Sequence, residues 1–552
     1  MNGIKLSNQQ PYAYFSLEFY DMANGIKGAG GLGILAADTR RIAESLGLPF
    51  VLVTPFYRRE MHQSMVDGEQ IETWQTRRPE DFGFQKVADF KINCAHRRTH
   101  KLDIYLKTIG STTIFTMGSD DFGELYAGEM SGDGRLLQQA SLGFAGWRAL
   151  RKFGASPSVV QMNEAATAFA AVAWLDELVT GGMDLTAAVR FVRKRALYTN
   201  HTLVQLAESE YTMKQFEKIV LPNIQSRVVW EFVRSMFSRD NHIKMSTLTI
   251  ELSGKRNCVS KLHAKVADYH DLMGRKVKFA AVTNGIDIDK WALPETLEKY
   301  RATGILDDKN RVGKVVPLEP VDIRKFKAIG RTKLNEVLKN RVDQYGQPVQ
   351  IPADAFLFDF KRRFADYKRP WLPFTDLAEI KNILIENDAY YILTGKAFLD
   401  DKVMHDKMQQ LLRTIDGDAE LKKRVCYIQD YDEELAIALS VGSNASINVP
   451  IVGWEACGTS WEKDIINLDI LISTNDGGVA DVAAKSYLRV DGKNEAEELA
   501  SLYKNMRQSI QIWRNDDELS KILHAQLLDY LPTISGPRMM GDYLQLFEIV
   551  LK

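Results

Sequence analysis

The sequence predicts an α/β protein with two doubly wound domains. Short runs of β-branched and aromatic residues alternate with patterns of helical period along the whole chain, which is typical of parallel sheets covered by helices on both faces. The chain has 552 residues and is therefore too long for a single hydrophobic core. Loops with polar residues or glycine follow many strand-like runs, and ligands bind at such carboxyl ends of parallel strands. We expect the carboxyl ends of both sheets to face each other across a cleft.

In the first half of the chain, a strand is expected at 13–16 because this run is aromatic and apolar. A glycine loop at 28–33 follows it, and the apolar spacing over 35–46 then indicates a helix. The other expected strands of this half are short apolar or β-branched runs between turn residues. They lie at 50–54, 102–106, 113–117, 159–162 and 196–199.

The second half of the chain shows the same alternation more clearly, with polar or glycine residues after each strand and helices expected from Lys368 and from Asp432. Its expected strands lie at 355–360, 390–394, 424–428, 445–448 and 468–473. No repeat or low-complexity linker marks a domain boundary, so we place it by motif positions. The expected domains are 1–285 and 286–552, and the last helix is expected to pack back on the first domain.

The composition excludes several classes of protein. The net charge of -1 and the pI near 6.8 give no basic field, which argues against nucleic acid or an acidic membrane as the main partner. The four cysteines are far apart and lack the spacing of metal ligands, so neither a disulfide framework nor a metal site is expected. The N-terminus does not resemble a signal peptide and no apolar run is long enough to span a bilayer. We therefore expect a cytoplasmic protein.

The segment Trp454 to Lys463 combines an acid, a run of small residues and a lysine at the apparent start of a helix. Small residues let backbone N–H groups approach an anion closely, and the lysine can act as a cation or attack an aldehyde as an amine. An ordinary helix start, with Thr459 or Ser460 as its cap and Lys463 in solvent, stays open as the alternative.

Two further loops suit phosphate. The loop 361–369 carries five basic residues directly after a buried-type strand, which favours anion binding over a surface charge run. The glycine loop at 28–33 could cradle a phosphate or be a plain tight turn, and its spacing does not match the dinucleotide-binding pattern. Asn163-Glu164 and Asn200-His201-Thr202 also follow expected strands, although either could be a structural turn. No serine-hydrolase or HExxH pattern is present. A transfer reaction that involves phosphate fits best.

Several motifs resemble the α-glucan phosphorylase family (glycogen, starch and maltodextrin phosphorylases) and occur in the family's order between residues 12 and 480. They are Tyr14-Phe15-Ser16-Leu17-Glu18-Phe19, Gly30-Gly31-Leu32-Gly33-Ile34-Leu35-Ala36, Thr199-Asn200-His201-Thr202, Val282-Thr283-Asn284-Gly285-Ile286, Arg363 through Tyr367-Lys368-Arg369, Gly395-Lys396-Ala397 and Glu455-Ala456-Cys457-Gly458-Thr459. The resemblance implies the GT-B architecture, in which two Rossmann-like domains face each other across a cleft. It also implies pyridoxal 5′-phosphate in the second domain.

The resemblance assigns roles to individual residues of this chain. Catalysis would depend on Arg363, Lys368, Glu455 and Lys463. The cofactor would be held by Lys463, Arg362, Lys368, Gly458 and Thr459, with Lys463 at the position of the family's Schiff-base lysine. The substrates would be held by Gly30, Gly31, Leu32, His201, Asn284, Tyr367, Glu455 and Gly458. The cofactor's own phosphate would exchange a proton with the substrate phosphate as the glycosidic bond breaks, and fixed cations would stabilise the two phosphates.

The chain departs from the family pattern at four places. Gly254 stands where long members have a sugar-binding histidine, and Cys457 replaces a serine. Trp461-Glu462 precede Lys463, and a neighbouring carboxylate tends to raise the pKa of a lysine. Ala165-Ala166 replace a glycine-histidine pair. The chain is also much shorter than the regulated members, which implies a compact and unregulated enzyme.

The expected function is reversible phosphorolysis of glycogen, starch or maltodextrin to glucose 1-phosphate. The expected partners are an α-1,4-glucan and inorganic phosphate, and a homodimer is a further expectation from the family. Two alternatives remain. A nucleotide-sugar-dependent glucosyltransferase of the same architecture would use the basic loop to grip a diphosphate. A non-catalytic glucan-binding relative is made conceivable by Gly254 and Glu462.

Overall fold

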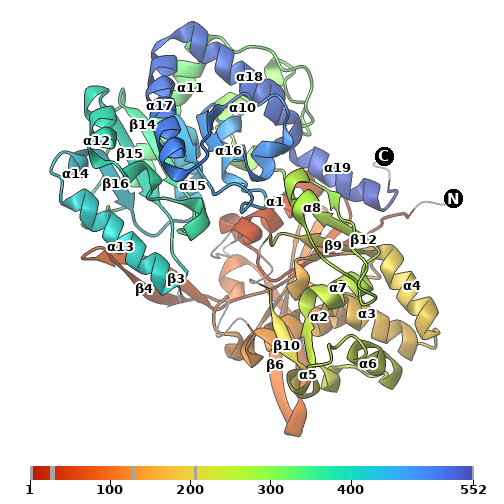
Figure 1. Cartoon of the computed structure of the whole chain (residues 1–552). Helices are drawn as coiled ribbons and strands as arrows, with labels where there is room; N and C mark the ends of the chain where they lie inside the picture. Colours follow the sequence, from red (N-terminus) through yellow and green to blue (C-terminus); the bar gives the residue numbers. More distant parts are fainter. Residues whose placement is uncertain (1–3, 25–30, 126–130, 204–207, 399–400, 550–552) are drawn as a thin grey trace. The chain divides into compact units, whose positions relative to one another are not determined.

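The computed structural model describes residues 4–24, 31–125, 131–203, 208–398 and 401–549 (Figure 1). The chain divides into two compact units. The first comprises 1–60, 75–283 and 539–552, and the second comprises 61–74 and 284–538. Within the described residues, no helix combines the length and the apolar character that crossing a membrane requires. The expectation that the two sheets face each other across a cleft stays a prediction.

The first unit contains a nine-stranded sheet in the order β13-β12-β9-β8-β1-β2-β7-β6-β5. All neighbours in it are parallel except β5, β6 and β7, which pair antiparallel at one edge. The sequence predicted parts of β6 and β7 but missed their antiparallel pairing and the whole of β5. The strands are β1 (Tyr12–Ser16), β2 (Phe50–Pro55), β5 (Gln85–Cys94), β6 (Arg98–Ile109), β7 (Thr112–Gly118), β8 (Val159–Asn163), β9 (Ala196–Asn200), β12 (Lys255–Cys258) and β13 (Ala280–Ala281), with a separate pair β10 (Glu210–Thr212) and β11 (His242–Lys244).

Helices cover this sheet, and their ends follow local capping rules. Asp184 caps α4, because its Oδ1 atom accepts a bond of 3.1 Å from the backbone N–H of Ala187. The helix expected at 35–46 is α1, but it begins earlier and takes in part of the predicted glycine loop. The helices are α1 (Gly31–Ser45), α2 (Asp133–Lys152), α3 (Phe169–Thr180), α4 (Leu185–Arg195), α5 (Met213–Ile219), α6 (Arg227–Arg234), α7 (Met245–Leu252), α8 (Lys261–Val266) and α19 (Gly536–Leu546).

The end of the chain takes part in the core of the first unit. Met539, Met540 and Tyr543 of α19 pack in one buried cluster with Tyr12 and Phe50 from neighbouring strands. Burial of large apolar side chains of this kind contributes about 1.5–3 kcal/mol for each residue. The first unit therefore depends on residues from both ends of the sequence.

The second unit contains a six-stranded parallel sheet in the order β16-β15-β14-β17-β18-β19. Each of the five strands expected in this half is present, and β19 was missed. The strands are β14 (Phe356–Lys361), β15 (Ala389–Thr394), β16 (Val425–Ile428), β17 (Ala445–Asn448), β18 (Ile470–Thr474) and β19 (Leu488–Val490). The hairpin β3 (Arg59–Val66) and β4 (Glu69–Thr76) supplies residues 61–74 to this unit, which the sequence did not indicate.

The helices α12, α15 and α17 pack against strands of this sheet (Figure 1). The helix expected from Asp432 is α15, and Asp432 caps it by accepting a bond of 3.0 Å from the N–H of Leu435. The helix expected from Lys368 was wrong, because Arg369 is left-handed with φ 50° and Pro370 follows it. The helices are α9 (Ile288–Trp291), α10 (Pro294–Ala302), α11 (Pro320–Leu338), α12 (Leu377–Glu386), α13 (Lys402–Asp416), α14 (Leu421–Arg424), α15 (Glu433–Gly442), α16 (Ser460–Ile466), α17 (Glu495–Arg514) and α18 (Asp516–Ile534).

We predict that Gly330→Ala lowers the thermal stability of the protein, although alanine favours a helix more than glycine does. A Cβ atom at Gly330 in α11 would lie 2.0 Å from the carbonyl oxygen of Val441 in α15. The two helices would have to separate, and overpacking of this kind costs about 1–3 kcal/mol. Gly541 in α19 is the control, because no described atom lies within 4 Å of its added Cβ. Thermal unfolding of both variants measures the effect, and equal midpoints would contradict the close packing.

Candidate functional site

Two loops leave the sheet of the second unit at the carboxyl ends of its central strands. The chain runs outward from β14 to β15 and β16 in one direction, and from β17 to β18 and β19 in the other. The strand order therefore reverses between β14 and β17, and ligands bind outside the carboxyl ends of strands at such a point. Residues 361–369, the basic loop, follow β14, and residues 449–459, the Glu455 loop, follow β17.

The two loops meet in an ion pair around Glu455. The Nζ atom of Lys368 donates a hydrogen bond of 2.7 Å to Glu455 Oε2, and Nη1 of Arg362 lies 3.9 Å from the same oxygen. Glu455 is buried, with 7% of its surface exposed. Burial alone would raise the pKa of Glu455, but the cations of the basic loop, first among them Lys368, outweigh it and lower the pKa. Glu455 is therefore a carboxylate at neutral pH.

Asp476 and two glycines hold the Glu455 loop in place. The Oδ2 atom of Asp476 accepts hydrogen bonds from the backbone N–H groups of Glu455 (2.9 Å) and Trp454 (3.2 Å). Gly458 has φ 70°, and a Cβ atom there would lie 3.1 Å from Cδ of Glu455. At Gly477 the added Cβ would lie 3.1 Å from Cγ of Glu455. Larger residues would thus crowd the carboxylate, so the glycines preserve the space around it.

Two of the five cations in the basic loop pair with carboxylates other than Glu455. The Nζ atom of Lys361 lies 2.6 Å from a carboxylate oxygen of Asp359 and 2.6 Å from one of Asp464, and all three side chains are buried. Arg369 forms an ion pair with Glu498 of α17. These carboxylates neutralise the two cations. The net positive charge of the loop therefore comes from its other three basic residues.

The three remaining basic residues of the loop are Arg362, Arg363 and Lys368. Arg362 is buried, and among the described residues neither of its Nη atoms has a hydrogen-bond partner. A buried guanidinium without acceptors is costly, and the oxygens of a phosphate group match its fork geometry. The guanidinium of Arg363 stacks on the ring of Phe398, with 4.2 Å from its carbon to the ring centroid. The residues present therefore fit a phosphate-bearing ligand.

Lys463 lies on α16 and is buried, so the alternative that placed it in solvent was wrong. Its Nζ atom is 3.6 Å from the centroid of the Trp291 ring. Asp464, the next residue, pairs with Lys361, and Lys361 directly precedes Arg362. The ion pair thus fixes the start of the basic loop to α16. A buried primary amine tied to a buried guanidinium in this way could hold a ligand that carries both an aldehyde and a phosphate.

The other features of this helix differ in part from expectation. α16 has seven residues, and Thr459 occupies its N-cap position without a side-chain cap bond. Glu462 is fully buried, and its Oε1 atom lies 3.7 Å from Sγ of Cys457. The backbone of Asn284 also contacts the Cys457 sulfur. Among the residues that the structure describes, no partner is found for Oδ1 of Asn284, which leaves a buried acceptor beside the Glu455 loop.

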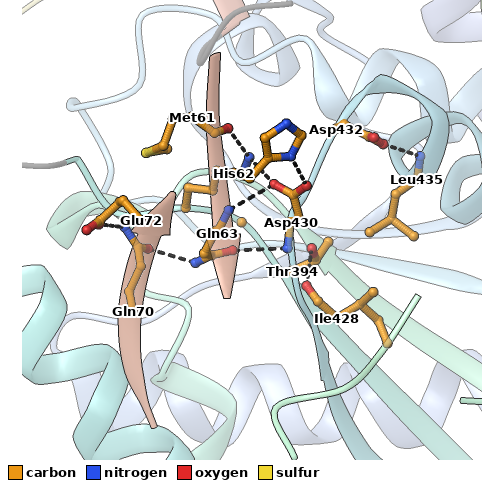
Figure 2. Close-up of polar contacts among 12 residues, drawn as sticks. Met61, His62, Gln63, Gln70, Glu72, Thr394, Ile428, Asp430, Asp432 and Leu435 are labelled. Carbon is orange, nitrogen blue, oxygen red and sulfur yellow. Dashed lines mark hydrogen bonds and ion pairs between the residues drawn. The ribbon is translucent and has the colours of Figure 1, made fainter. Parts of the chain in front are cut away.

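The hairpin β3–β4 supports the basic loop from the side of β15 and β16. Figure 2 shows His62 and Gln63 of β3 directed at Asp430, which follows β16. His62 Nδ1 lies 2.8 Å from Asp430 Oδ2, and Nζ of Lys396 donates a bond of 2.6 Å to Oδ1 of the same carboxylate. Burial would raise the pKa of Asp430, but Lys396 and these hydrogen bonds lower it. Asp430 thus joins the hairpin to the loop after β15.

The loop after β15 in turn contacts the basic loop. Gln70 of β4 accepts a hydrogen bond of 3.1 Å from the N–H of Ala397, and the carbonyl of Lys396 accepts one of 3.1 Å from Phe364. A Cβ atom at Gly395 would lie 1.8 Å from the carbonyl oxygen of Arg362, so only glycine allows this approach. The motif Gly395-Lys396-Ala397 therefore positions Arg362. The hairpin β3–β4, which contacts this motif, carries no local sequence signal that indicates where it docks.

A second polar cluster lies in the first unit, where the strand order reverses between β1 and β8. Glu164 has φ 81°, which is strained for a non-glycine residue, and its Oε2 atom accepts bonds from the N–H of His201 (2.9 Å) and the hydroxyl of Thr202 (3.1 Å). Burial raises the pKa of Glu164 to about 6. His201 Nε2 lies 2.6 Å from Oδ1 of Asn163. Sequence reasoning gave Glu164 no role, although its place after a strand was the available signal.

The remaining residues singled out by the sequence are distributed over both units. Gly30 lies outside the described residues, and Gly31 and Leu32 begin α1 in the first unit. Tyr367 is in the basic loop, with its ring centroid 4.9 Å from Nζ of Lys368. Gly254 belongs to the first unit, and a Cβ atom there would lie 2.3 Å from the carbonyl oxygen of Arg193. The backbone therefore excludes a histidine at this position unless it moves.

We predict that the first unit loses stability as pH falls below about 6.5, in part because His201 stays neutral in the folded protein. Burial, with a contribution from His263, lowers the pKa of His201 to about 3. Between about pH 6.5 and about pH 3, the unfolded chain binds a proton at His201 and the folded chain does not. The cost is therefore at most about 1.4 kcal/mol for each pH unit. His201→Gln should show a shallower loss between pH 7 and pH 5 in thermal unfolding, whereas the exposed control His242→Gln should follow the wild type. Equal slopes for wild type and His201→Gln would contradict this account.

Comparisons with known proteins identify the family of this chain. The carbohydrate phosphorylase family model matches residues 145–531. A maltodextrin phosphorylase of Thermococcus litoralis is 24% identical over 98% of this chain and 70% of its own length. A glycogen phosphorylase of Aquifex aeolicus is 25% identical over 94% of this chain and 83% of its own length. For a glycogen phosphorylase of Mycobacterium bovis the identity is 26%, over 84% of this chain and only 60% of that protein. Because the family model covers more than half of the residues, the chain belongs to the carbohydrate phosphorylase family.

Proposed function

We propose that the chain is an α-glucan phosphorylase, which transfers a glucosyl unit between an α-1,4-glucan and inorganic phosphate with release of glucose 1-phosphate. The observation that carries the proposal is Arg362, a buried guanidinium whose Nη atoms have no hydrogen-bond partner among the described residues. It lies beside Lys368 and Glu455 at the carboxyl end of a central parallel strand. Membership of the phosphorylase family supports the same substrate class.

The residues of the basic loop would stabilise the reaction by fixed charge. A glucosyl unit develops positive charge as its glycosidic bond breaks, while the attacking phosphate brings negative charge into the same space. Arg362 and Lys368 would bind the phosphate, and Arg363 would add to the local positive potential. Glu455, with Asn284, Tyr367 and the backbone of Gly458, would hold the sugar. Because these groups sit on a buried and preorganised frame, they need little rearrangement when charge develops.

The same residues suit pyridoxal 5′-phosphate as the cofactor. Lys463 offers a buried primary amine for its aldehyde, and Arg362 and Lys368 offer donors for its phosphate, with Gly458 and Thr459 beside them. When bound, this cofactor supplies a phosphate group that can exchange a proton with the substrate phosphate. Lys463 would hold and orient it, while the buried position of α16 would exclude water.

In the first unit, Gly30, Gly31, Leu32 and His201 are proposed contacts for phosphate and glucan. His201 would serve as a neutral hydrogen-bonding group, because its pKa is lowered to about 3. The division of the chain into an N-terminal glucan-binding domain and a C-terminal cofactor domain in a GT-B arrangement belongs to the same proposal. So does the expected homodimer.

The activity is tested by incubating the purified protein with a maltooligosaccharide and inorganic phosphate. We predict release of glucose 1-phosphate that requires phosphate and that stops when phosphate is left out. Binding of the glucan without turnover would favour the non-catalytic alternative instead. Glucosyl transfer from a nucleotide sugar, independent of phosphate, would favour the nucleotide-sugar-dependent alternative. Either of these two results contradicts the proposed function.

The cofactor assignment is tested by absorbance and by labelling. We predict an absorbance band beyond the protein band that borohydride abolishes, with the reduced label on Lys463. Lys290 is an internal control, because its Nζ atom also lies near the Trp291 ring, at 4.8 Å, but it pairs with Glu433. Lys463→Ala should lose the band and about a thousandfold or more of the activity while thermal unfolding stays close to that of the wild type. A label on Lys290, or full activity in Lys463→Ala, would contradict the assignment.

A further inference from the structure

We infer that Gln63 of β3 is a positioning residue for the basic loop. It acts through the hydroxyl of Tyr427 and the carbonyl of Gly395 on the backbone of Arg362. The inference rests on the proposed function, because it gives Gln63 the task of holding Arg362 where that side chain would meet the cofactor's phosphate. All residues that carry it belong to the second unit, to which the hairpin contributes residues 61–74.

Gln63 is the first link of this chain of contacts. Its side chain is buried, with 4% exposed. Its Nε2 atom donates to the hydroxyl of Tyr427 at 2.8 Å and to Oε1 of Gln70 at 2.7 Å, while its Oε1 atom accepts from the N–H of Asp430 at 3.3 Å (Figure 2). A buried amide that is bonded at both its nitrogen and its oxygen has a fixed direction. Gln63 therefore presents an N–H donor to Tyr427.

Tyr427 of β16 is the second link. Its hydroxyl oxygen accepts the bond from Gln63, and burial raises the pKa of Tyr427, so the hydroxyl keeps its single proton. Two acceptors lie near that proton, and the carbonyl of Gly395 is closer than Oε1 of Gln63, which lies at 3.1 Å. The hydroxyl therefore donates to Gly395. The ring of Tyr427 also packs edge-on against Phe364 of the basic loop, with 6.0 Å between the ring centroids.

Gly395 is the third link and touches the basic loop directly. An added Cβ atom there would lie 1.8 Å from the carbonyl oxygen of Arg362, so the two backbones are in contact. Hydrogen bonds flank this contact, because the N–H of Arg362 donates to Thr394 at 3.2 Å and that of Phe364 donates to Lys396 at 3.1 Å. A shift of Gly395 would therefore move the start of the basic loop with it.

A second buried glutamine, Gln429, also joins the hairpin to the end of β16. Its Oε1 atom accepts a bond of 3.0 Å from the N–H of Met65 in β3, and its Nε2 atom donates to the carbonyl of Asp343. These contacts lead away from the basic loop. Of the two glutamines, only Gln63 is linked to Arg362, although both hold the same hairpin.

The experiment measures amide hydrogen exchange in the purified chain by mass spectrometry of peptides that cover residues 361–369. Gln63→Met keeps the length of the side chain and removes its amide, and Tyr427→Phe removes only the hydroxyl. We expect the N–H groups of Arg362 and Phe364 to exchange about fivefold faster in each variant, which corresponds to the loss of one buried hydrogen bond. The double variant should exceed either single variant by less than about twofold, because both changes break the same chain of contacts.

Gln429→Met is the matched control, because it removes a buried amide of the same size from the same hairpin. Exchange in its 361–369 peptides should stay within about twofold of the wild type. Equal exchange in Gln63→Met and the wild type would overturn the inference, and so would equal acceleration by Gln429→Met. Should Gln63→Met fail to fold, Tyr427→Phe decides the question, because it keeps the ring that packs on Phe364.

A kinetic measurement separates positioning from a general loss of stability. With pyridoxal 5′-phosphate in excess, kcat for release of glucose 1-phosphate should fall about fivefold in Gln63→Met and in Tyr427→Phe. KM for the maltooligosaccharide should stay within about twofold, because residues 362–364 are not proposed contacts of the glucan. Faster exchange with unchanged kcat would overturn the inference. A wild type that releases no glucose 1-phosphate would contradict the proposed function alone, since the exchange comparison does not depend on turnover.

Discussion

The buried ion pair between Lys361 and Asp464 is the contact on which the rest of the site depends. It joins the end of β14 to α16, and its chain neighbours are Arg362 on one side and Lys463 on the other. A second carboxylate, Asp359, completes the pairing of Lys361, and burial raises the pKa of Asp359 to about 6. Loss of one partner from a buried pair costs about 3–5 kcal/mol, because an uncompensated charge stays behind. The positions of the amine and the guanidinium are therefore set by the same interaction.

This pairing also limits how many cations of the basic loop can bind an anion. Carboxylates inside the protein neutralise Lys361 and Arg369, and they hold the loop rigid. Arg362 and Lys368 remain as the cations beside Glu455, and the Nη atoms of Arg362 have no hydrogen-bond partner among the described residues. Preorganised charges of this kind are effective because no solvent or side chain must reorient during the reaction.

Much of the second unit could be predicted from its sequence. Its central strands are short apolar runs, and the basic loop and the Glu455 loop follow two of them, so the rule for parallel sheets brings both to one edge. Two things could not be predicted from local sequence. Asp464 and Glu498, which pair with Lys361 and Arg369, come from distant segments, and the hairpin at 59–76 carries no signal for where it docks. The helix expected from Lys368 was a different kind of miss, because Pro370 is a local signal that disfavours helix at the residue before it. In the first unit, the strain at Glu164 depends on tertiary contacts that periodicity does not encode.

The most direct measurement of the central claim is a crystal structure of the protein with inorganic phosphate. The account predicts a tetrahedral anion within hydrogen-bond distance of the Nη atoms of Arg362 and of Nζ of Lys368. An anion that binds elsewhere, while Lys368 stays bonded to Glu455 and Arg362 stays without an acceptor, would contradict it.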